Sequence, residues 1–176
     1  MKKRIKLSKT GYYLSGIFFY IIFVLFDQLT KLLALDILKD NMPKIIIKNV
    51  LEFSYVENKG IAFGLFQGKT VFFAIVALIF TFIFAWLYIR IPKVRKYFPL
   101  LCINLFMAAG AMGNLLDRTF RGYVIDFIYF KLIDFPVFNI ADIYVVTGAV
   151  GLIICVLFLY KDEDFKFLKT GKKNDK

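Results

Sequence analysis

Four long apolar stretches limit what this chain can fold into. They run from about residue 12 to 35, 70 to 91, 99 to 116 and 140 to 160. A helix needs roughly 20 mainly apolar residues to cross a hydrocarbon layer about 30 Å thick, so each stretch can span a membrane. In a chain of 176 residues, 60% of them hydrophobic, one soluble core could not bury all four. We therefore expect an all-α membrane protein with four transmembrane helices.

The first stretch follows Lys2, Lys3 and Arg4, an arrangement that also occurs in secretory signal peptides. Its apolar run is longer than that of a signal peptide, and no A-x-A-like cleavage site follows it. We interpret it as a membrane span.

The positive charge is concentrated beside the apolar stretches. The net charge is +11, and the flanking cations are Lys2, Lys3, Arg4, Lys6, Lys9, Arg90, Lys93, Arg95, Lys96, Lys161, Lys166, Lys169, Lys172, Lys173 and Lys176. By the positive-inside rule both termini are predicted to be cytoplasmic, and segments of about 36–69 and 117–139 to face outward. Clusters of this kind, without an interleaved aromatic-basic surface, do not indicate nucleic-acid binding.

The two outward segments have the composition of short strands. Residues 44–66 mix β-branched and aromatic residues with turn residues at 58–60, and residues 117–139 are broken by Gly122 and Pro136. We expect a small extended platform at the membrane interface, because lipid does not tolerate exposed non-helical backbone. The membrane domain is predicted to comprise residues 1–160, and residues 161–176 a polar, solvated cytoplasmic tail.

The composition excludes several kinds of active site. The chain has no histidine and two cysteines, Cys102 and Cys155, which both lie within apolar stretches. This argues against a zinc site and against a Ser-His or Cys-His nucleophile. A Ser-Lys pair is formally open, but Ser15 lies toward the cytoplasmic side and Ser54 has no lysine at helical spacing. We predict no metal and no cofactor.

Ionisable residues in or near membrane spans are costly, which makes them candidates for function. Asp27 and Lys31 are four residues apart, so on a helix they share a face and are predicted to form a structural ion pair. Asn114, Asp117 and Arg118 lie at the outer end of the third stretch. The forked donors of Arg118 suit a carboxylate or a peptide carbonyl, although an arginine at this depth can also reach lipid headgroups.

Two further carboxylates are predicted at the same outer face. Asp126 lies in the second outward segment, and Asp142 lies just inside the start of the fourth span. Two close carboxylates share a proton, so one can activate a water while the other protonates or polarises the scissile carbonyl. A structural interpretation fits these residues equally well, with Asp142 as a charge favoured at a helix N-terminus and Asp126 as a loop carboxylate.

Five motifs, in their order along the chain, resemble those of the bacterial lipoprotein signal peptidase family, also called signal peptidase II. They are DQLTKLLA, VENKGIAFGLF, GAMGNLLDR, GYVIDF and FPVFNIAD, and they cover roughly residues 27–142. The resemblance implies an aspartic endopeptidase of the bacterial plasma membrane, with four spans, a small extracytoplasmic β-cradle and a mobile flanking helix. It also implies cleavage of prolipoprotein signal peptides on the amino side of a diacylglyceryl-modified cysteine, contact with membrane lipid, and inhibition by globomycin. We expect a monomer.

The resemblance assigns roles to individual residues. The two catalytic aspartates correspond to Asp126 and Asp142. Positions that orient the substrate or support the aspartates are matched by Asn58, Asn114, Arg118 and Asn139. Positions that support the structure are matched by Asp27, Lys31 and Asp117. Departures from the residues common in the family occur at Lys59, Ile61 and Gly64, so details of the substrate pocket are expected to differ.

A different class of function is also compatible with four spans and a few buried charges. A small transporter or substrate-binding membrane subunit could use the same charges to hold a solute or protons. That class favours charged residues along the centres of the spans, whereas the acidic groups here cluster at one face. A purely structural subunit gives no reason for two outer aspartates.

Overall fold

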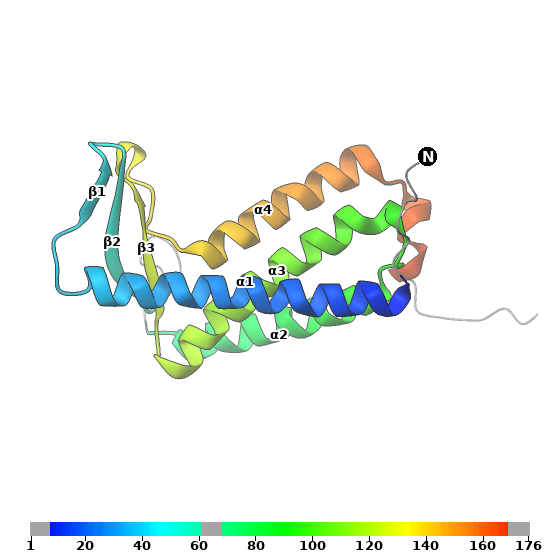
Figure 1. Ribbon diagram of the computed structural model, residues 1–176, viewed down its shortest axis with the longest axis horizontal. Coiled ribbons are helices and arrows are strands. Elements are labelled where there is room, and N and C mark those ends of the chain that lie inside the picture. Colours follow the sequence, from blue (N-terminus) through cyan, green and yellow to red (C-terminus); the bar gives the residue numbers. More distant parts are fainter. Residues whose placement is uncertain (1–7, 61–67, 169–176) are drawn as a thin grey trace, which may run out of the picture.

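The computed structural model describes residues 8–60 and 68–168 and shows four long helices (Figure 1). They are α1 (Lys9–Leu38), α2 (Thr70–Arg90), α3 (Phe98–Phe120) and α4 (Ile140–Ile154), and α4 continues as a π-helical turn, Cys155–Leu159. Each is long and apolar enough to cross a membrane. The four predicted spans are confirmed, and α1 and α3 extend about three or four residues further toward the outer segments than the hydropathy indicated.

The helix α3 occupies the centre of the bundle, and α1, α2 and α4 all pack against it. Two of its glycines permit this close packing. A Cβ atom at Gly110 would lie 2.5 Å from the carbonyl oxygen of Ala141 on α4, and one at Gly113 would lie 2.3 Å from Oδ2 of Asp27 on α1. The two glycines of α3 therefore allow the backbone of α4 and the Asp27 carboxylate of α1 to approach α3 closely, one helical turn apart.

The predicted extended segments form a three-stranded antiparallel sheet, in the order β1-β2-β3. Its strands are β1 (Lys44–Ile47), β2 (Leu51–Asn58) and β3 (Val124–Phe130). Gly122, with φ +77°, makes the turn between α3 and β3, a conformation that glycine adopts without strain. The central strand β2 pairs Val56 with Asp126 and Asn58 with Val124, which fixes the position of Asp126 relative to Asn58.

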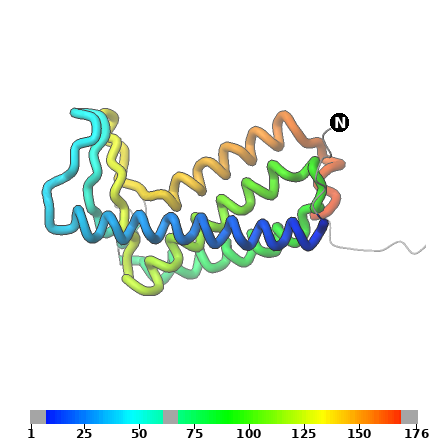
Figure 2. The backbone as a smooth tube through the Cα atoms, in the orientation of Figure 1, coloured from blue at the N-terminus to red at the C-terminus, as the bar shows by residue number. Residues whose placement is uncertain are grey.

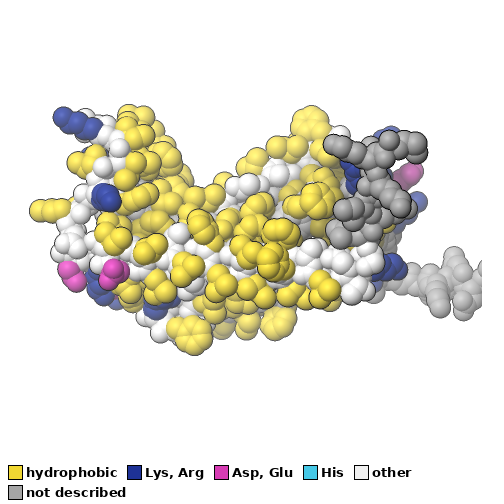
Figure 3. Space-filling view, viewed as in Figure 1, with side chains coloured by type: hydrophobic (Ala, Val, Ile, Leu, Met, Phe, Trp, Pro, Cys, Tyr) yellow, Lys and Arg dark blue, Asp and Glu magenta, His cyan; other side chains and the backbone are white. Residues whose placement is uncertain are grey.

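The sheet lies at one end of the bundle, and both ends of the described chain lie at the other (Figures 1 and 2). On the face seen in Figure 3, apolar side chains cover the middle of the helices and charged side chains gather toward the two ends. Phe84 is the only buried residue of α2, although this helix is strongly apolar. This distribution of side chains is that of a multi-pass membrane protein.

The beginning of the C-terminal segment is helical and contacts the bundle. Residues from 161 onward were expected to form a polar, solvated tail, but Asp162–Leu168 forms a 3-10 helix that packs on the end of the bundle. Phe165 and Phe167 pack against the buried cluster that contains Tyr160, and Arg90 donates a hydrogen bond to the carbonyl of Phe167. Partial burial of the two phenylalanine rings stabilises this packing. Residues 169–176 lie outside the described part.

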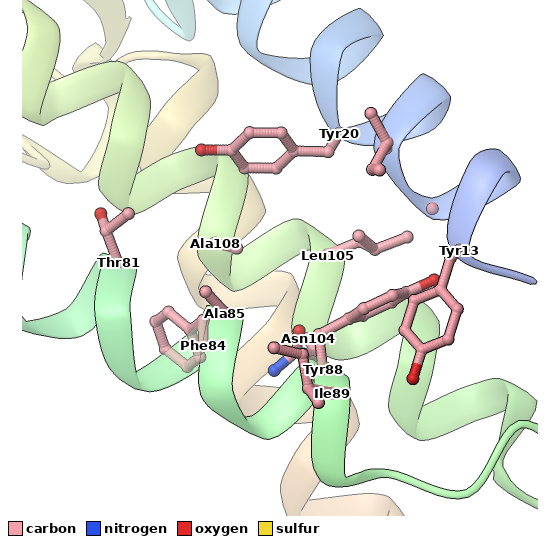
Figure 4. A pocket seen from close by; sticks show the side chains of 12 residues that line it. Tyr13, Tyr20, Thr81, Phe84, Ala85, Tyr88, Ile89, Asn104, Leu105 and Ala108 are labelled. Carbon is pink, nitrogen blue, oxygen red and sulfur yellow. The ribbon is translucent and has the colours of Figure 1, made fainter.

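A cleft of about 320 Å³ lies between α1 and α2, with α3 at its base (Figure 4). Tyr13 and Tyr20 from α1, Tyr88 from α2 and Asn104 from α3 contribute to its lining. Oδ1 of Asn104 is buried and has no hydrogen-bond partner among the described residues. The described residues that line this cleft include no carboxylate.

Candidate active site

Asp126 lies on β3 and is 2% exposed. Its two carboxylate oxygens accept hydrogen bonds from two asparagine side chains. Asn58, at the end of β2, donates to Oδ2 across 2.8 Å, and Asn139 donates to Oδ1 across 2.7 Å. The side chain is therefore held from the sheet and from the start of α4 at the same time.

Asp142 lies in the first turn of α4 and forms a capping box with Asn139. Oδ1 of Asn139 accepts from the backbone N–H of Asp142 at 3.0 Å, and Oδ2 of Asp142 accepts from the backbone N–H of Asn139 at 3.1 Å. The second carboxylate oxygen, Oδ1, accepts from Nδ2 of Asn114 at 2.9 Å. A capping arrangement that stabilises the helix start thus also fixes the carboxylate.

Asn139 joins the two carboxylates, because it binds Asp126 through its side chain and Asp142 through its backbone. Both aspartates line one cavity of about 540 Å³. Burial, and then the neighbouring Asp142 carboxylate, raise the pKa of Asp126 to about 7, against the hydrogen bonds from Asn58 and Asn139, which lower it. A carboxylic acid that keeps its proton near neutral pH beside a second carboxylate is suited to acid-base catalysis.

The remaining walls of this cavity are mostly apolar. They are formed by the end of β3, the segment after it and one face of α4, with the residues Phe130, Ile133, Phe135, Pro136, Val137, Phe138, Ile143, Val146 and Thr147. Such walls lower the local dielectric and limit the access of water, which strengthens the electrostatic effects of the few polar groups.

Arg118 also lines this cavity, from the last turn of α3. It donates to the carbonyl oxygens of Gly60 and Asn114, each across 3.4 Å, and its guanidinium lies 5.7 Å from the ring centre of Phe73. The side chain is therefore directed into the protein, to the cavity that both aspartates line. Its cation lies where a peptide carbonyl could approach the carboxylates.

The predicted ion pair between Asp27 and Lys31 is present and belongs to a larger buried network. Lys31 Nζ lies 2.9 Å from Asp27 Oδ2 and 3.0 Å from Asp117 Oδ2, and all three side chains are fully buried. Asp27 Oδ1 also accepts from the backbone N–H of Ala141 at 2.9 Å, and Asp117 Oδ2 from that of Ile125 at 3.1 Å. The network therefore fixes the residues next to both aspartates of the pair.

Sequence reasoning missed two members of this network. Gln28 donates to Asp27, to Asp117 and to the carbonyl of Gly113, and Arg121 pairs with Asp117. The spacing of four between Asp117 and Arg121 was a usable signal, because it places both on one face of α3. For Gln28, the only indication in the sequence of a place in the network was a polar side chain within an apolar stretch.

Of the three positions that depart from the family pattern, the structure describes only Lys59. Lys59 is exposed, and its carbonyl accepts from Thr70 at 3.4 Å. Ile61 and Gly64 lie outside the described residues. Within residues 8–60 and 68–168, no group of three or more His, Cys, Asp or Glu side chains is placed to hold a metal ion.

Comparisons with known proteins identify the family of this chain. A protein called lipoprotein signal peptidase from Clostridioides difficile is 46% identical over 132 residues, which are 75% of this chain and 87% of that protein. One of the same name from Clostridium novyi is 41% identical over 76% of this chain and 91% of that protein. A solved bacterial membrane enzyme superposes with a TM-score of 0.71 at 28% identity, over 90% of this chain and 93% of the other. The family model for signal peptidase (SPase) II matches residues 19–158, and the chain therefore belongs to that family.

Proposed function

We propose that this protein is an aspartic endopeptidase that removes signal peptides from prolipoproteins, cutting on the amino side of the diacylglyceryl-modified cysteine. The observation that carries the proposal is the pairing of Asp126 and Asp142 through Asn139 inside one cavity. The names of its relatives and its family membership support the substrate class.

In the proposed mechanism the two carboxylates have different tasks. Asp142, whose two oxygens accept hydrogen bonds from Asn114 and Asn139, acts as the base and removes a proton from a water. The water oxygen attacks the scissile carbonyl carbon while Asp126, protonated near neutral pH, gives its proton to the carbonyl oxygen. Asp142 then transfers its proton to the amide nitrogen, the C–N bond breaks, and Asp126 recovers its proton from the tetrahedral diol.

Asn58 and Arg118 complete the proposed site. Asn58 holds Oδ2 of Asp126, so that the carboxyl group presents a fixed orientation to the substrate. Arg118 provides a cation at the cavity wall, where it can bind a backbone carbonyl of the extended peptide. Since all of these groups come from one chain, we propose that a monomer is active.

The membrane supplies much of the substrate binding. The apolar segment of a signal peptide can lie among the spans, and the diacylglyceryl chains stay in lipid, so both anchors hold the cleavage site near the interface. Such anchoring lowers the entropic part of the barrier. We propose that the sheet end faces outward from the bacterial plasma membrane and that both termini are cytoplasmic. The described flanking cations belong to helix ends and connections at the end of the bundle away from the sheet; they are Lys9, Arg90, Lys93, Arg95, Lys96, Lys161 and Lys166.

The experiment is cleavage of a lipidated prolipoprotein by the purified protein in detergent or lipid. Asp126→Asn and Asp142→Asn are each expected to abolish cleavage, while circular dichroism and gel filtration show that the variants still fold. Lys9→Gln is the matched control, since this exposed lysine begins α1 at the end of the bundle away from the sheet. Cleavage that persists in either folded aspartate variant would rule out the pair as the catalytic groups.

A further inference from the structure

We propose that Lys31 is a positioning residue for the two aspartates and acts through the side-chain amide of Asn114. This inference rests on the function proposed above, and it assigns Lys31 a part in catalysis beyond holding helices together. Three contacts of its ammonium group carry the argument.

The ammonium of Lys31 uses all of its hydrogens. Besides Asp27 and Asp117, at 2.9 Å and 3.0 Å, it donates to Oδ1 of Asn114 across 2.9 Å. An ammonium group has three hydrogens and no lone pair, so an atom that contacts it has to be an acceptor. Lys31 therefore requires the amide oxygen of Asn114, and not the amide nitrogen, to face it.

The orientation of the amide oxygen also determines where the amide nitrogen of Asn114 points. With the oxygen turned to Lys31, Nδ2 of Asn114 points to Asp142 and donates to Oδ1 across 2.9 Å. The reversed amide would turn its NH₂ group to the ammonium and its oxygen to the carboxylate, and both contacts would be repulsive. Asn139 also donates to Oδ1 of Asn114, at 3.1 Å, and favours the same orientation.

The charge balance explains how a lysine can be fully buried here. Lys31 and Arg121 supply two positive charges, and Asp27 and Asp117 supply two negative charges, so the network is neutral. A neutral and fully hydrogen-bonded network avoids the desolvation penalty of an isolated ion. Only one of its two cations, Lys31, contacts Asn114.

This difference between the two cations provides a matched comparison. Lys31→Met and Arg121→Met each remove one positive charge and one partner of Asp117, but only the first removes a donor to the amide oxygen of Asn114 and leaves Asn139 as the other donor. Among the described residues, two cations act on the aspartate pair. Lys31 from α1 lowers the pKa of Asp126, and Arg118 from α3 lines the same cavity. Asp117 contacts Lys31.

The test measures kcat, KM and the pH dependence of kcat for lipidated prolipoprotein cleavage by the full-length protein. Lys31→Met is expected to lower kcat about tenfold or more, with KM within about threefold, because a hydrogen bond to a charged carboxylate is lost. The alkaline limb of its pH profile should move upward, since the charge of Lys31 lowers the pKa of Asp126 and the variant removes that charge. Arg121→Met should keep the wild-type profile.

A second variant keeps the proposal testable if Lys31→Met does not fold. Asn114→Asp retains an acceptor for Lys31 but places an oxygen opposite Asp142, so it should be inactive at neutral pH and regain activity at lower pH, when a proton bridges the two carboxylates. A folded Lys31→Met protein with wild-type kcat and pH profile would overturn the proposal, as would an Asn114→Asp protein whose activity loss is the same at every pH. If the wild-type protein itself does not cleave the substrate, the proposed function fails, and this inference fails with it. If the wild-type protein cleaves and Lys31→Met cleaves equally well, only this inference fails.

Discussion

Asn139 donates its side-chain amide to Asp126 across 2.7 Å, so the residue that caps α4 also binds the carboxylate on β3. One side chain thereby couples the start of a membrane helix to the sheet at its end. Because the same residue holds Asp142 through its backbone N–H, the geometry of the pair depends on how α4 meets β3.

Substitution of Asn139 separates its two tasks. Asn139→Ala should lower the free energy of unfolding by about 1 kcal/mol through loss of the cap, and also lower kcat. Asn139→Ser should recover most of the stability, because serine caps helices well, but not kcat, because its side chain is too short to reach Asp126. Thermal unfolding and steady-state cleavage assays measure both effects. A serine variant with wild-type kcat would contradict the role of the bond to Asp126.

The pH dependence of cleavage should report the proton on Asp126. Its pKa of about 7 means that the acid form is lost as the pH rises through neutrality. We expect kcat to fall on the alkaline side with an apparent midpoint near 7. Bound substrate buries Asp126 further and so raises this midpoint. The measurement is kcat between about pH 5 and 9 at saturating substrate. A rate that stays constant up to pH 9 would show that this proton is not needed.

The same group should make stability pH-dependent. The pKa of Asp126 is raised from 3.8 to about 7 in the folded protein, so between these values the folded state binds more protons than the unfolded state. The contribution of Asp126 to the free energy of unfolding is therefore fully present below about pH 4 and is lost as the pH rises through 7. The loss is on the order of 4 kcal/mol.

Asp126→Asn removes the titrating group and provides the comparison. The difference in free energy of unfolding between this variant and the wild type should shift in favour of the variant as the pH rises from 4 to 8. Denaturation in detergent at a series of pH values measures this difference. Parallel stability curves for the two proteins would mean that Asp126 does not titrate in this range.

The sequence was sufficient to predict the spans, the sheet and the common location of Asp126 and Asp142. Hydropathy identifies spans because each is a local, continuous pattern, and alternation across the membrane then places both aspartates at one end. From residues alone their role stayed open between catalysis and helix-end electrostatics, and the motifs favoured catalysis.

Contacts between distant residues were beyond such reasoning. Arg121 donates to Gln28 across 3.3 Å, although 93 residues separate them, and no local pattern encodes that pairing. The register that pairs Val56 with Asp126 depends on a bulge in β2, which the alternation of residue types does not reveal. The packing of Phe165 and Phe167 was hidden within a segment whose composition is mainly polar.

The close approach of α1 and α3 at Gly113 gives a final prediction. A Cβ atom here would lie 2.3 Å from Oδ2 of Asp27 and 3.3 Å from Cβ of Ala141. Asp27 cannot yield easily, since it is fully buried and bound to Lys31. Gly113→Ala should therefore cost about 1–3 kcal/mol of stability and, by displacing the residue before Asp142, lower kcat as well.

Gly151→Ala is the matched control for this change, because a Cβ at Gly151 meets only the side chain of Ile103, at 3.1 Å, which can rotate away. Thermal unfolding and prolipoprotein cleavage, measured on both variants, distinguish the two positions. Gly151→Ala should stay close to the wild type in both measurements. If Gly113→Ala did the same, the contact between Asp27 and the start of α4 would not be what holds the catalytic pair in place.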